Sequence, residues 1–462
     1  MRLTVVGGGG FRVPLVYGAL LEDAADPRVD DVVLHDVDPG RLSVITAVLE
    51  QMAATIGGAP KVTATTDLDD AVRGADFVFS AVRVGGLAGR VADERVALRL
   101  GMLGQETTGP GGVAYGLRTV PVAMRIAERV QAVAPQAWVI NFTNPAGLVT
   151  EAMSRVLGDR VIGICDSPIG MCRRAARALG VAPEHAWFDY VGLNHMGWLR
   201  SIRVRGHDEL PRLLRDDSLL ASFEEGRLFG GDWLRALGAI PNEYLWYWYF
   251  HRQAVQAIRP DGQTRGGFLH AQQQRFYDAV GSDPSDALAE WRRVRHERDA
   301  SYMAESRPDR TTDVRDKDDV DDGGYERVAL AIMAAIARDE RSVHILDVRN
   351  RAAVSGLDAL AVVEVPCLVD GNGAHPIAAD PVEEHQLGLM QTMKAVERET
   401  IAAALNGSRD GALRAFALHP MVDSVDVART LLDGYVRAVP ELSAVLRGGP
   451  AGQSLRSTSP RR

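Results

Sequence analysis

The stretch MRLTVVGGGGFRVPLVYGALLE, residues 1–22, decides the fold that we expect. Leu3 to Val6 form an apolar run typical of a strand. Pro14 then opens a segment with helical spacing, and proline favours the first turn of a helix. Strand, tight turn and helix in this order are typical of a dinucleotide-binding turn, in which backbone amides approach a pyrophosphate at the helix N-terminus. The glycines of the turn are Gly7, Gly8, Gly9 and Gly10.

Apolar strands alternate with helical segments through the first third of the chain. This alternation predicts parallel strands with helices covering both faces of the sheet. We therefore expect an α/β fold in which residues 1–168 form a Rossmann-like, doubly wound parallel sheet. The further expected strands lie at residues 31–36, 62–65, 76–82, 138–142 and 160–165, and a helix is expected over 117–133.

The alternation is lost after Pro168. Residues 187–205 have the pattern of strands, and most of residues 208–300 have the pattern of helices. We expect residues 169–446 to form a second, mixed α/β domain. Residues 447–462 lack apolar periodicity, which predicts a disordered tail.

Composition limits the class of protein and its partners. The 462 residues include 52 Lys+Arg and 61 Asp+Glu, and the net charge of −9 argues against a nucleic-acid partner. The three cysteines argue against a disulfide framework and favour a reducing compartment. Since no run approaches about 18 apolar residues, we expect neither a membrane span nor a membrane partner. The expected localisation is cytoplasmic.

Asp36 extends the dinucleotide hypothesis from the glycine turn to the end of the second strand. A carboxylate there would accept hydrogen bonds from an adenosine ribose and repel a 2′-phosphate, which favours NAD over NADP. The match to G-x-G-x-x-G is imperfect, because Arg12 stands where the third glycine belongs. A tight turn with a strand-end aspartate and no ligand is the alternative.

Other polar residues follow apolar runs in the same way. Cys165 and His195 would suit a divalent metal, although a lone cysteine or histidine is more often a packed core residue. The sequence alone does not show whether the neighbouring polar residues converge on one site. These are Glu106, Asn144, Asp166 and Asn194.

An aromatic segment and three arginines leave structural and functional roles open. The segment NEYLWYWYF, residues 242–250, suits an aromatic wall of the core. One of its tyrosines would serve as a base only if a cation lowered its pKa from about 10. Arginines commonly lie at the surface, but they also clamp anionic ligands. The candidates are Arg83, Arg90 and Arg265.

Seven segments in one order resemble glycoside hydrolase family 4, and most closely its 6-phospho-β-glucosidases. The likeness runs from residue 1 to roughly residue 440. The segments are GQETTGPGG (104–112), NFTNPAG (141–147), ICDSP (164–168), GLNHMGW (192–198), PNEYLWYWY (241–249), GGYERVALA (323–331) and VVEVPCLVDGNGAHP (362–376).

The resemblance implies a lactate/malate dehydrogenase-like fold, a recycled NAD+ and a divalent metal, typically Mn2+. In that family NAD+ takes hydride from carbon 3 of the sugar, and a tyrosine takes the proton from carbon 2. The aglycone leaves by elimination, water adds, and the hydride returns. The implied partner is a small glycoside that carries a 6-phosphate, and the implied assembly is a homodimer or homotetramer.

The resemblance also implies roles for individual residues. Cys165 and His195 match the metal ligands, Tyr244 matches the base, and Asp166 matches the acid that protonates the leaving group. The positions that match substrate-binding residues are Arg90, Glu106, Asn144 and Arg265. The cofactor-binding residues would be Gly7, Gly8, Gly9, Gly10, Phe11 and Asp36.

One segment departs from the family pattern. Phe11, Arg12 and Val13 stand where the family usually has Ser or Thr after the glycines. Either Arg12 supplies charge to a 6-phosphate, or the substrate lacks that phosphate. The spacing from Tyr244 to Arg265 is also about one residue longer than the family pattern.

Two other functions compete with the glycosidase hypothesis. A dehydrogenase acting on a sugar or a 2-hydroxy acid would accumulate NADH. A non-catalytic NAD-binding regulatory protein would leave Cys165, His195 and Tyr244 without a reason to occur together.

Overall fold

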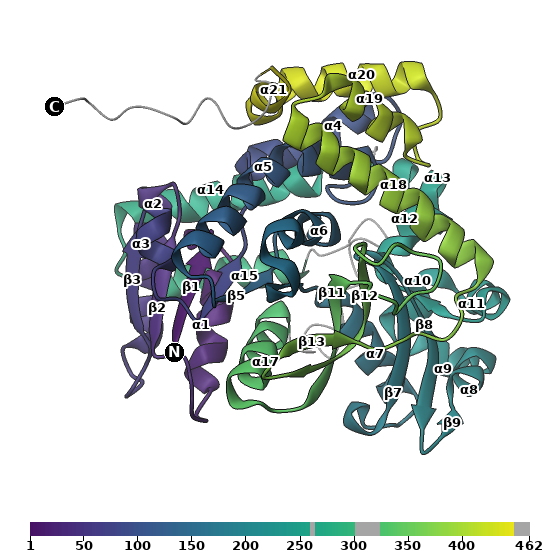
Figure 1. Cartoon of the computed structure of the whole chain (residues 1–462), viewed down its shortest axis with the longest axis horizontal. Coiled ribbons are helices and arrows are strands. Elements are labelled where there is room, and N and C mark those ends of the chain that lie inside the picture. The colour runs from purple at the N-terminus through teal and green to yellow at the C-terminus, as the bar shows by residue number, and fades with distance from the viewer. Residues whose placement is uncertain (259–263, 301–323, 448–462) are drawn as a thin grey trace.

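The first six strands pair in parallel in the order β3-β2-β1-β4-β5-β6, which is the order of a doubly wound sheet. The computed structural model describes residues 1–258, 264–300 and 324–447 (Figure 1). The central strands are buried almost throughout because helices cover both faces, as predicted for the α/β class. The strands are β1 (Arg2–Val6), β2 (Asp31–His35), β3 (Lys61–Thr65), β4 (Phe77–Ser80), β5 (Trp138–Asn141) and β6 (Val161–Gly163).

Local signals set where the connecting helices begin. Asp38 and Asp67 accept hydrogen bonds from backbone amides of the first turns of α2 and α3. Helix α5 begins at Pro110, earlier than predicted, because its first glycines pack against the loop before it. A Cβ at Gly112 would lie 2.1 Å from the Thr107 carbonyl oxygen. The helices are α1 (Val13–Glu22), α2 (Pro39–Ala53), α3 (Leu68–Val72), α4 (Gly86–Arg99), α5 (Pro110–Val133), α6 (Ala146–Leu157) and the 3₁₀ turn η1 (Gly158–Arg160).

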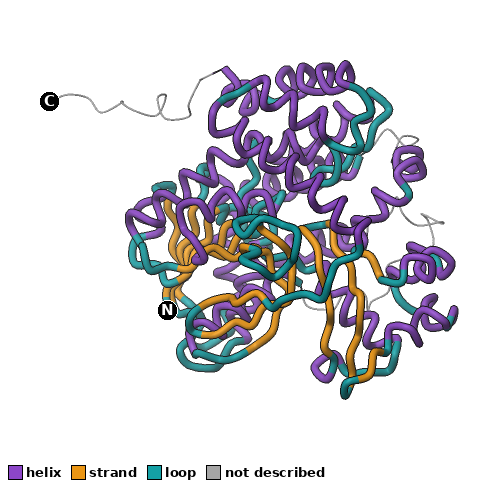
Figure 2. The backbone as a smooth tube through the Cα atoms, turned by 45° about the vertical axis from the view of Figure 1, so that its right-hand side comes forward, coloured by secondary structure: helices purple, strands orange, loops and turns teal. Residues whose placement is uncertain are grey.

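Antiparallel strands extend the same sheet beyond β6. The order continues β6-β11-β12-β7-β8-β10, with β13 paired to β12 and β9 paired to β8, so both expected domains contribute to one 13-stranded sheet. Figure 2 shows these strands in orange with helices around them. The strands are β7 (Trp187–Leu193), β8 (Met196–Val204), β9 (His207–Asp208), β10 (Ile240–Pro241), β11 (Ser342–Arg349), β12 (Val362–Asp370) and β13 (Gly373–Pro376).

The second half of the chain is rich in helices. These are α7 (Ser167–Ala178), η2 (Pro183–His185), α8 (Leu210–Arg215), α9 (Asp217–Ala221), α10 (Glu224–Phe229), α11 (Gly231–Leu237), η3 (Glu243–Leu245), α12 (Trp246–Tyr249), α13 (His251–Ile258), α14 (Arg265–Ser282), α15 (Ala287–Ala300) and α17 (Tyr325–Arg338). Of these helices, α7, η3, α12 to α15 and α17 contribute residues to the pocket described below.

The last four helices of the described chain pack against helices of its first half. Helices α18 and α21 pack on α5, and α20 packs on α4, above the sheet in Figure 1. They are α18 (Glu384–Asn406), α19 (Arg409–Leu418), α20 (Val425–Ala438) and α21 (Pro440–Arg447). Beyond Arg447, the expected tail lies outside the described residues.

The three cysteines are buried and unbridged, in agreement with the absence of a disulfide framework. Among the described residues, no helix is both long and apolar enough to cross a membrane.

Candidate active site

A pocket of about 610 Å³ opens at the carboxyl ends of the parallel strands, where doubly wound sheets place their ligands. It gathers residues whose spacing in the sequence alone did not connect them. Of the predicted residues, it is lined by Gly7, Gly10, Phe11, Arg90, Glu106, Asn144, Cys165, Asp166, His195, Tyr244 and Arg265. Gly8, Gly9 and Asp36 lie beside this pocket and are not part of its wall.

The glycine turn lies flat against β2. The amides of Gly7 and Gly8 donate to the His35 carbonyl oxygen at 2.9 and 2.7 Å. Gly7 has φ +92°, and a Cβ at Gly8 would lie 2.8 Å from the Leu34 Cβ. Only glycine allows this close approach, and the turn leads directly into the N-terminus of α1. The geometry therefore fits a bound pyrophosphate.

Asp36 is fixed beside the turn. Its carboxylate accepts hydrogen bonds from the amides of Gly9 at 3.1 Å and Asp38 at 3.2 Å. These bonds hold the carboxylate at the end of β2, which is the position expected for a carboxylate that binds an adenosine ribose. The described residues thus fit a dinucleotide.

Phe11 is an apolar residue at a position where the family usually has Ser or Thr. Its ring is buried and meets the Phe276 ring edge-on at 5.2 Å, while the Trp291 indole N–H donates to the Phe11 carbonyl oxygen at 2.8 Å. These contacts tie the turn to α14 and α15. The Phe11 side chain therefore packs into the core.

Arg12 reaches the pocket from the same turn. Its guanidinium lies 4.8 Å from the centroid of the Tyr325 ring and 5.5 Å from that of Phe142, and these two rings stack at 3.9 Å. The Tyr325 hydroxyl donates to the Arg12 carbonyl oxygen at 2.9 Å. Cation–π contact and this hydrogen bond together position the positive charge at the pocket wall.

Arg90, Arg265 and Arg298 are among the further arginines that line the pocket with Arg12. Burial lowers the pKa of the Arg298 guanidinium, and the positive charges of Arg12, Arg265 and Arg90 lower it further. The Arg265 guanidinium donates to the Arg298 carbonyl oxygen at 2.8 Å. Guanidinium groups bind phosphate oxygens through charge-assisted hydrogen bonds, so the arginine group (Arg12, Arg90, Arg265 and Arg298) fits a phosphate.

Glu94 links two members of the arginine group. Its carboxylate accepts from the Arg90 Nε at 2.9 Å and from the Gly266 amide at 2.8 Å. Because Gly266 follows Arg265 at the start of α14, Glu94 fixes the spacing between Arg90 and Arg265. The longer spacing from Tyr244 to Arg265 therefore does not remove Arg265 from the pocket.

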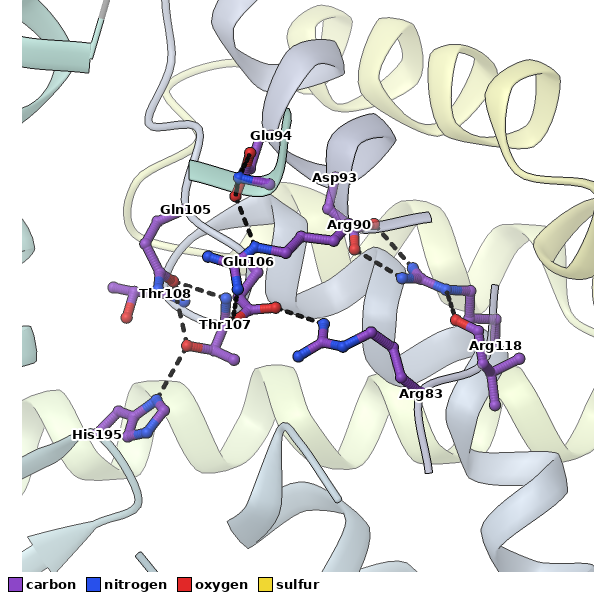
Figure 3. Close-up of polar contacts among 12 residues, drawn as sticks. Arg83, Arg90, Asp93, Glu94, Gln105, Glu106, Thr107, Thr108, Arg118 and His195 are labelled. Carbon is purple, nitrogen blue, oxygen red and sulfur yellow. Dashed lines mark hydrogen bonds and ion pairs between the residues drawn. The ribbon is translucent and has the colours of Figure 1, made fainter. Parts of the chain in front are cut away.

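Glu106 is clamped by two arginines, as Figure 3 shows. Arg90 Nη1 lies 2.8 Å from Glu106 Oε1, and Arg83 pairs with the other oxygen. Burial raises the pKa of Glu106, but the charges of Arg83 and Arg90 outweigh burial and lower it to about 2. Glu106 is therefore ionised at neutral pH and holds both guanidinium groups in place.

Cys165 and Asp166 follow β6 directly. Cys165 is 7% exposed, and burial raises the pKa of its thiol, with further increases from the carboxylates of Glu364 and Asp166. A bound cation would reverse this effect and favour the thiolate. Asp166 is the N-cap residue of α7, but its side chain makes no capping hydrogen bond.

His195 occupies the two-residue turn between β7 and β8. Its φ of +62° is unusual for a residue other than glycine and costs on the order of 1 kcal/mol. Its ring stacks on the Tyr244 ring at 3.7 Å with an angle of 5° between the planes. Burial lowers the pKa of His195 to about 4, although Glu106 and Asp166 oppose the shift. The imidazole is thus neutral near pH 7, as metal binding requires.

Cys165 and His195 fit a metal that keeps positions open for substrate. Across residues 1–258, 264–300 and 324–447, no group of three or more His, Cys, Asp or Glu side chains is arranged to hold an ion. Two protein ligands of moderate softness leave the remaining positions to water or sugar oxygens. The described residues therefore fit an open catalytic site and not a closed structural one.

Asn144 offers an unsatisfied acceptor at the pocket. Its buried Oδ1 receives no hydrogen bond from any described residue. A buried amide oxygen without a donor costs free energy, so a ligand hydroxyl there would recover it.

Residues that were not predicted from the sequence also shape the site. The Glu364 carboxylate accepts from the Tyr190 hydroxyl at 2.7 Å and from Asn194 Nδ2 at 3.4 Å, which supports the turn that carries His195. A charged residue inside the apolar run VVEVPCLV was the available signal. Thr107, Arg298 and Tyr325 gave no comparable signal.

The fold and this pocket define an α/β protein of the doubly wound class with its candidate site in the crevice at the strand ends. Residues 2–181 match the family model described as family 4 glycosyl hydrolase, and residues 190–422 match the model of that family's C-terminal domain. The chain belongs to family 4 of the glycosyl hydrolases, which confirms the resemblance drawn from its seven segments.

Named relatives cover nearly the whole chain. A 6-phospho-alpha-glucosidase of Leptotrichia buccalis is 31% identical over 96% of this chain and 99% of its own. The solved 6-phospho-beta glucosidase of Thermotoga maritima, with NAD and glucose-6-phosphate, has a TM-score of 0.80 and 26% identity over 96% of this chain and 99% of its own. A solved 6-phospho-alpha-glucosidase from gut microorganisms, in complex with NAD and Mn2+, has a TM-score of 0.79 and 26% identity over 96% and 98%.

Proposed function

We propose that this glycosidase hydrolyses 6-phosphorylated glucosides with NAD+ and Mn2+ as cofactors, and that it prefers the β-anomer. The observation that carries the proposal is one pocket that holds the arginine group together with Cys165, His195 and Tyr244. A positively charged subsite beside a metal-binding pair suits a phosphorylated sugar. Solved relatives that bind NAD, Mn2+ and glucose-6-phosphate support the same assignment.

The position of Arg12 supports a phosphorylated substrate despite the departure from the family pattern at the glycine turn. The hydroxyls expected at positions 11–13 are absent, but Arg12 lines the pocket wall and its charge acts on Arg298 of the arginine group. A charge-assisted contact replaces a neutral one, and such contacts are about twice as strong. Of the two alternatives left by the sequence, the phosphorylated substrate is therefore favoured.

The chain's own groups account for the proton transfers. When bound, NAD+ supplies reversible hydride removal at carbon 3, and the metal supplies Lewis-acid stabilisation of the adjacent oxygens. Tyr244, stacked on His195, takes the proton from carbon 2. Asp166, next to the ligand Cys165, donates a proton to the departing glycosidic oxygen. Asn144 accepts a hydrogen bond from a sugar hydroxyl, which orients the ring.

The β preference rests on the segments that resemble the 6-phospho-β-glucosidases. Among the relatives, names with both anomers occur. Proton removal at carbon 2 does not depend on which face of carbon 1 carries the aglycone, so the anomer is set by the pocket around the leaving group. Both anomers therefore belong in the test.

Release of 4-nitrophenol tests the proposal. The full chain is incubated under reducing conditions with the α- and β-glucosides of 4-nitrophenol, each with and without a 6-phosphate, and NAD+ and Mn2+ are omitted in turn. We expect release from the β-linked 6-phosphate only when both cofactors are present, without accumulation of NADH. Stoichiometric NADH would support the competing dehydrogenase, and faster release from the α-linked 6-phosphate would reverse the anomer.

A further inference from the structure

The loop at residues 104–108 makes a hydrogen bond to His195 through the Thr107 side chain. The Thr107 hydroxyl oxygen lies 2.9 Å from His195 Nδ1, as Figure 3 shows. Either group could be the donor, because a hydroxyl and a neutral imidazole nitrogen each donate or accept. The direction of this bond decides which ring nitrogen of His195 carries the proton.

Gln105 has only one possible orientation in this loop. The backbone amides of Thr107 and Thr108 donate to its side-chain Oε1 at 2.6 and 2.5 Å. A backbone N–H only donates, so the atom that receives both must be the carbonyl oxygen and not the NH₂ group. Two amides thus fix the Gln105 oxygen next to Thr107.

The Gln105 oxygen determines the direction of the Thr107 hydroxyl. Thr107 Oγ1 lies 3.1 Å from Gln105 Oε1, and only the hydroxyl carries a proton that can lie between these oxygens. The hydroxyl therefore donates to Gln105, and its lone pair accepts from His195 Nδ1–H. The reverse arrangement would leave two oxygens facing each other with no proton between them.

We infer that Gln105 and Thr107 are positioning residues that hold His195 in the Nδ1–H tautomer and leave Nε2 as the nitrogen that binds the metal. This inference rests on the proposed role of His195 as a metal ligand. Hydrogen bonds of this kind fix both the tautomer and the ring orientation of a ligating histidine. The orientation matters here because the same ring stacks on Tyr244.

Matched variants of Thr107 test the inference by Mn2+ binding. Thr107→Val keeps the shape but removes the acceptor, whereas Thr107→Ser keeps the hydroxyl. Calorimetric titration of the NAD+-loaded full chain should show affinity for Mn2+ about 10- to 100-fold weaker in Thr107→Val. Thr107→Ser should remain within about threefold of the unchanged chain. Equal affinity in all three proteins would overturn the inference.

Nuclear magnetic resonance of ¹⁵N-labelled histidine gives a second readout that does not need the metal. The His195 resonances are assigned by their loss in His195→Gln. We expect the Nδ1–H pattern in the unchanged chain and in Thr107→Ser, and a shift towards Nε2–H in Thr107→Val. An Nε2–H pattern in the unchanged chain would overturn the inference. If the chain has the Nδ1–H pattern but binds no Mn2+, the proposed role of Mn2+ as a cofactor is wrong, while the assignment of the His195 tautomer holds.

Discussion

The two sides of the pocket are built in different ways. The proposed cofactor side consists of Gly7 to Gly10 and Asp36, which lie within one β-α-β unit, where backbone amides of the turn donate to the His35 carbonyl oxygen and the Asp36 carboxylate. The proposed sugar side draws Glu106, Cys165, His195, Tyr244 and Arg265 from five separate segments, and these residues line one pocket. A site made of backbone contacts leaves a local sequence pattern, whereas a site made of distant side chains does not.

Tyr244→Phe should have the largest effect, because it should impair turnover on the sugar side and leave NAD+ binding on the cofactor side unchanged. Removing the hydroxyl removes the proposed base, so kcat should fall by at least about 100-fold. NAD+ affinity should not change, because Tyr244 lies on the sugar side. Steady-state kinetics and NAD+ titration measure the two quantities. Turnover near that of the unchanged chain would remove Tyr244 from the base role.

Cys165→Ser should weaken the binding of Mn2+ and leave the binding of NAD+ unchanged. A hydroxyl is a poorer ligand than a thiolate for a transition metal, so Mn2+ affinity should fall by at least about tenfold. NAD+ affinity serves as the control. An unchanged Mn2+ titration would show that Cys165 is not a ligand.

Arg12→Met tests whether the glycine turn, through Arg12, also binds the phosphate of the sugar. A lost hydrogen bond to a charged group costs about 1.5–3 kcal/mol, so KM for the 6-phosphorylated substrate should rise about 10- to 100-fold. Arg12→Lys keeps the charge and should recover part of the loss. If both variants keep the KM of the unchanged chain, the phosphate is held without Arg12.

Asp36→Asn should affect only the cofactor side. The amide keeps one acceptor but loses the charge that repels a 2′-phosphate, so the preference for NAD+ over NADP+ should shrink by about fivefold to tenfold. Titrations with both dinucleotides measure the ratio, and Mn2+ affinity is the control. A ratio that does not move would place the selectivity elsewhere.

Glu106→Gln should change the stability of the fold, and the size of this change should depend on pH. The folded-state pKa of Glu106 is lowered to about 2 from an ordinary 4.5 by Arg83 and Arg90. The stability that this carboxylate contributes is therefore present above about pH 4.5 and is lost as pH falls towards 2. Urea unfolding of both proteins at several pH values should show their difference shrinking over that range. A difference that stays constant with pH would contradict the ion-pair account.

The fold class was predictable from the sequence because its signals are local. Gly7 to Gly10 mark the first turn, and the alternation of strands and helices gave the parallel sheet. The insertion of β11 and β12 between β6 and β7 was not predictable, since strands from residues 342–370 pair with partners more than 170 residues away in the sequence. Long-range antiparallel pairing leaves no periodic signal along the chain.

The candidate site was predictable only in part. Cys165, His195 and Tyr244 were connected by the family resemblance, and their spacing alone gave no reason to join them. The contact between Thr107 and His195 could not be predicted, because one neutral hydrogen bond between residues 88 positions apart leaves no pattern of charge or hydrophobicity in the sequence. Arg298 was missed for a related reason, because an arginine on a predicted helix suggests a solvated face.

Hydrolysis in heavy water tests the central claim that the proton on carbon 2, for which Tyr244 is the proposed base, is removed during glycoside cleavage. The full chain, with NAD+ and Mn2+, converts the 6-phosphorylated 4-nitrophenyl glucoside in D₂O, and mass spectrometry with proton NMR locates deuterium in the released sugar phosphate. The account predicts one deuterium at carbon 2 and none at the other carbons. A released sugar without deuterium on carbon would contradict it.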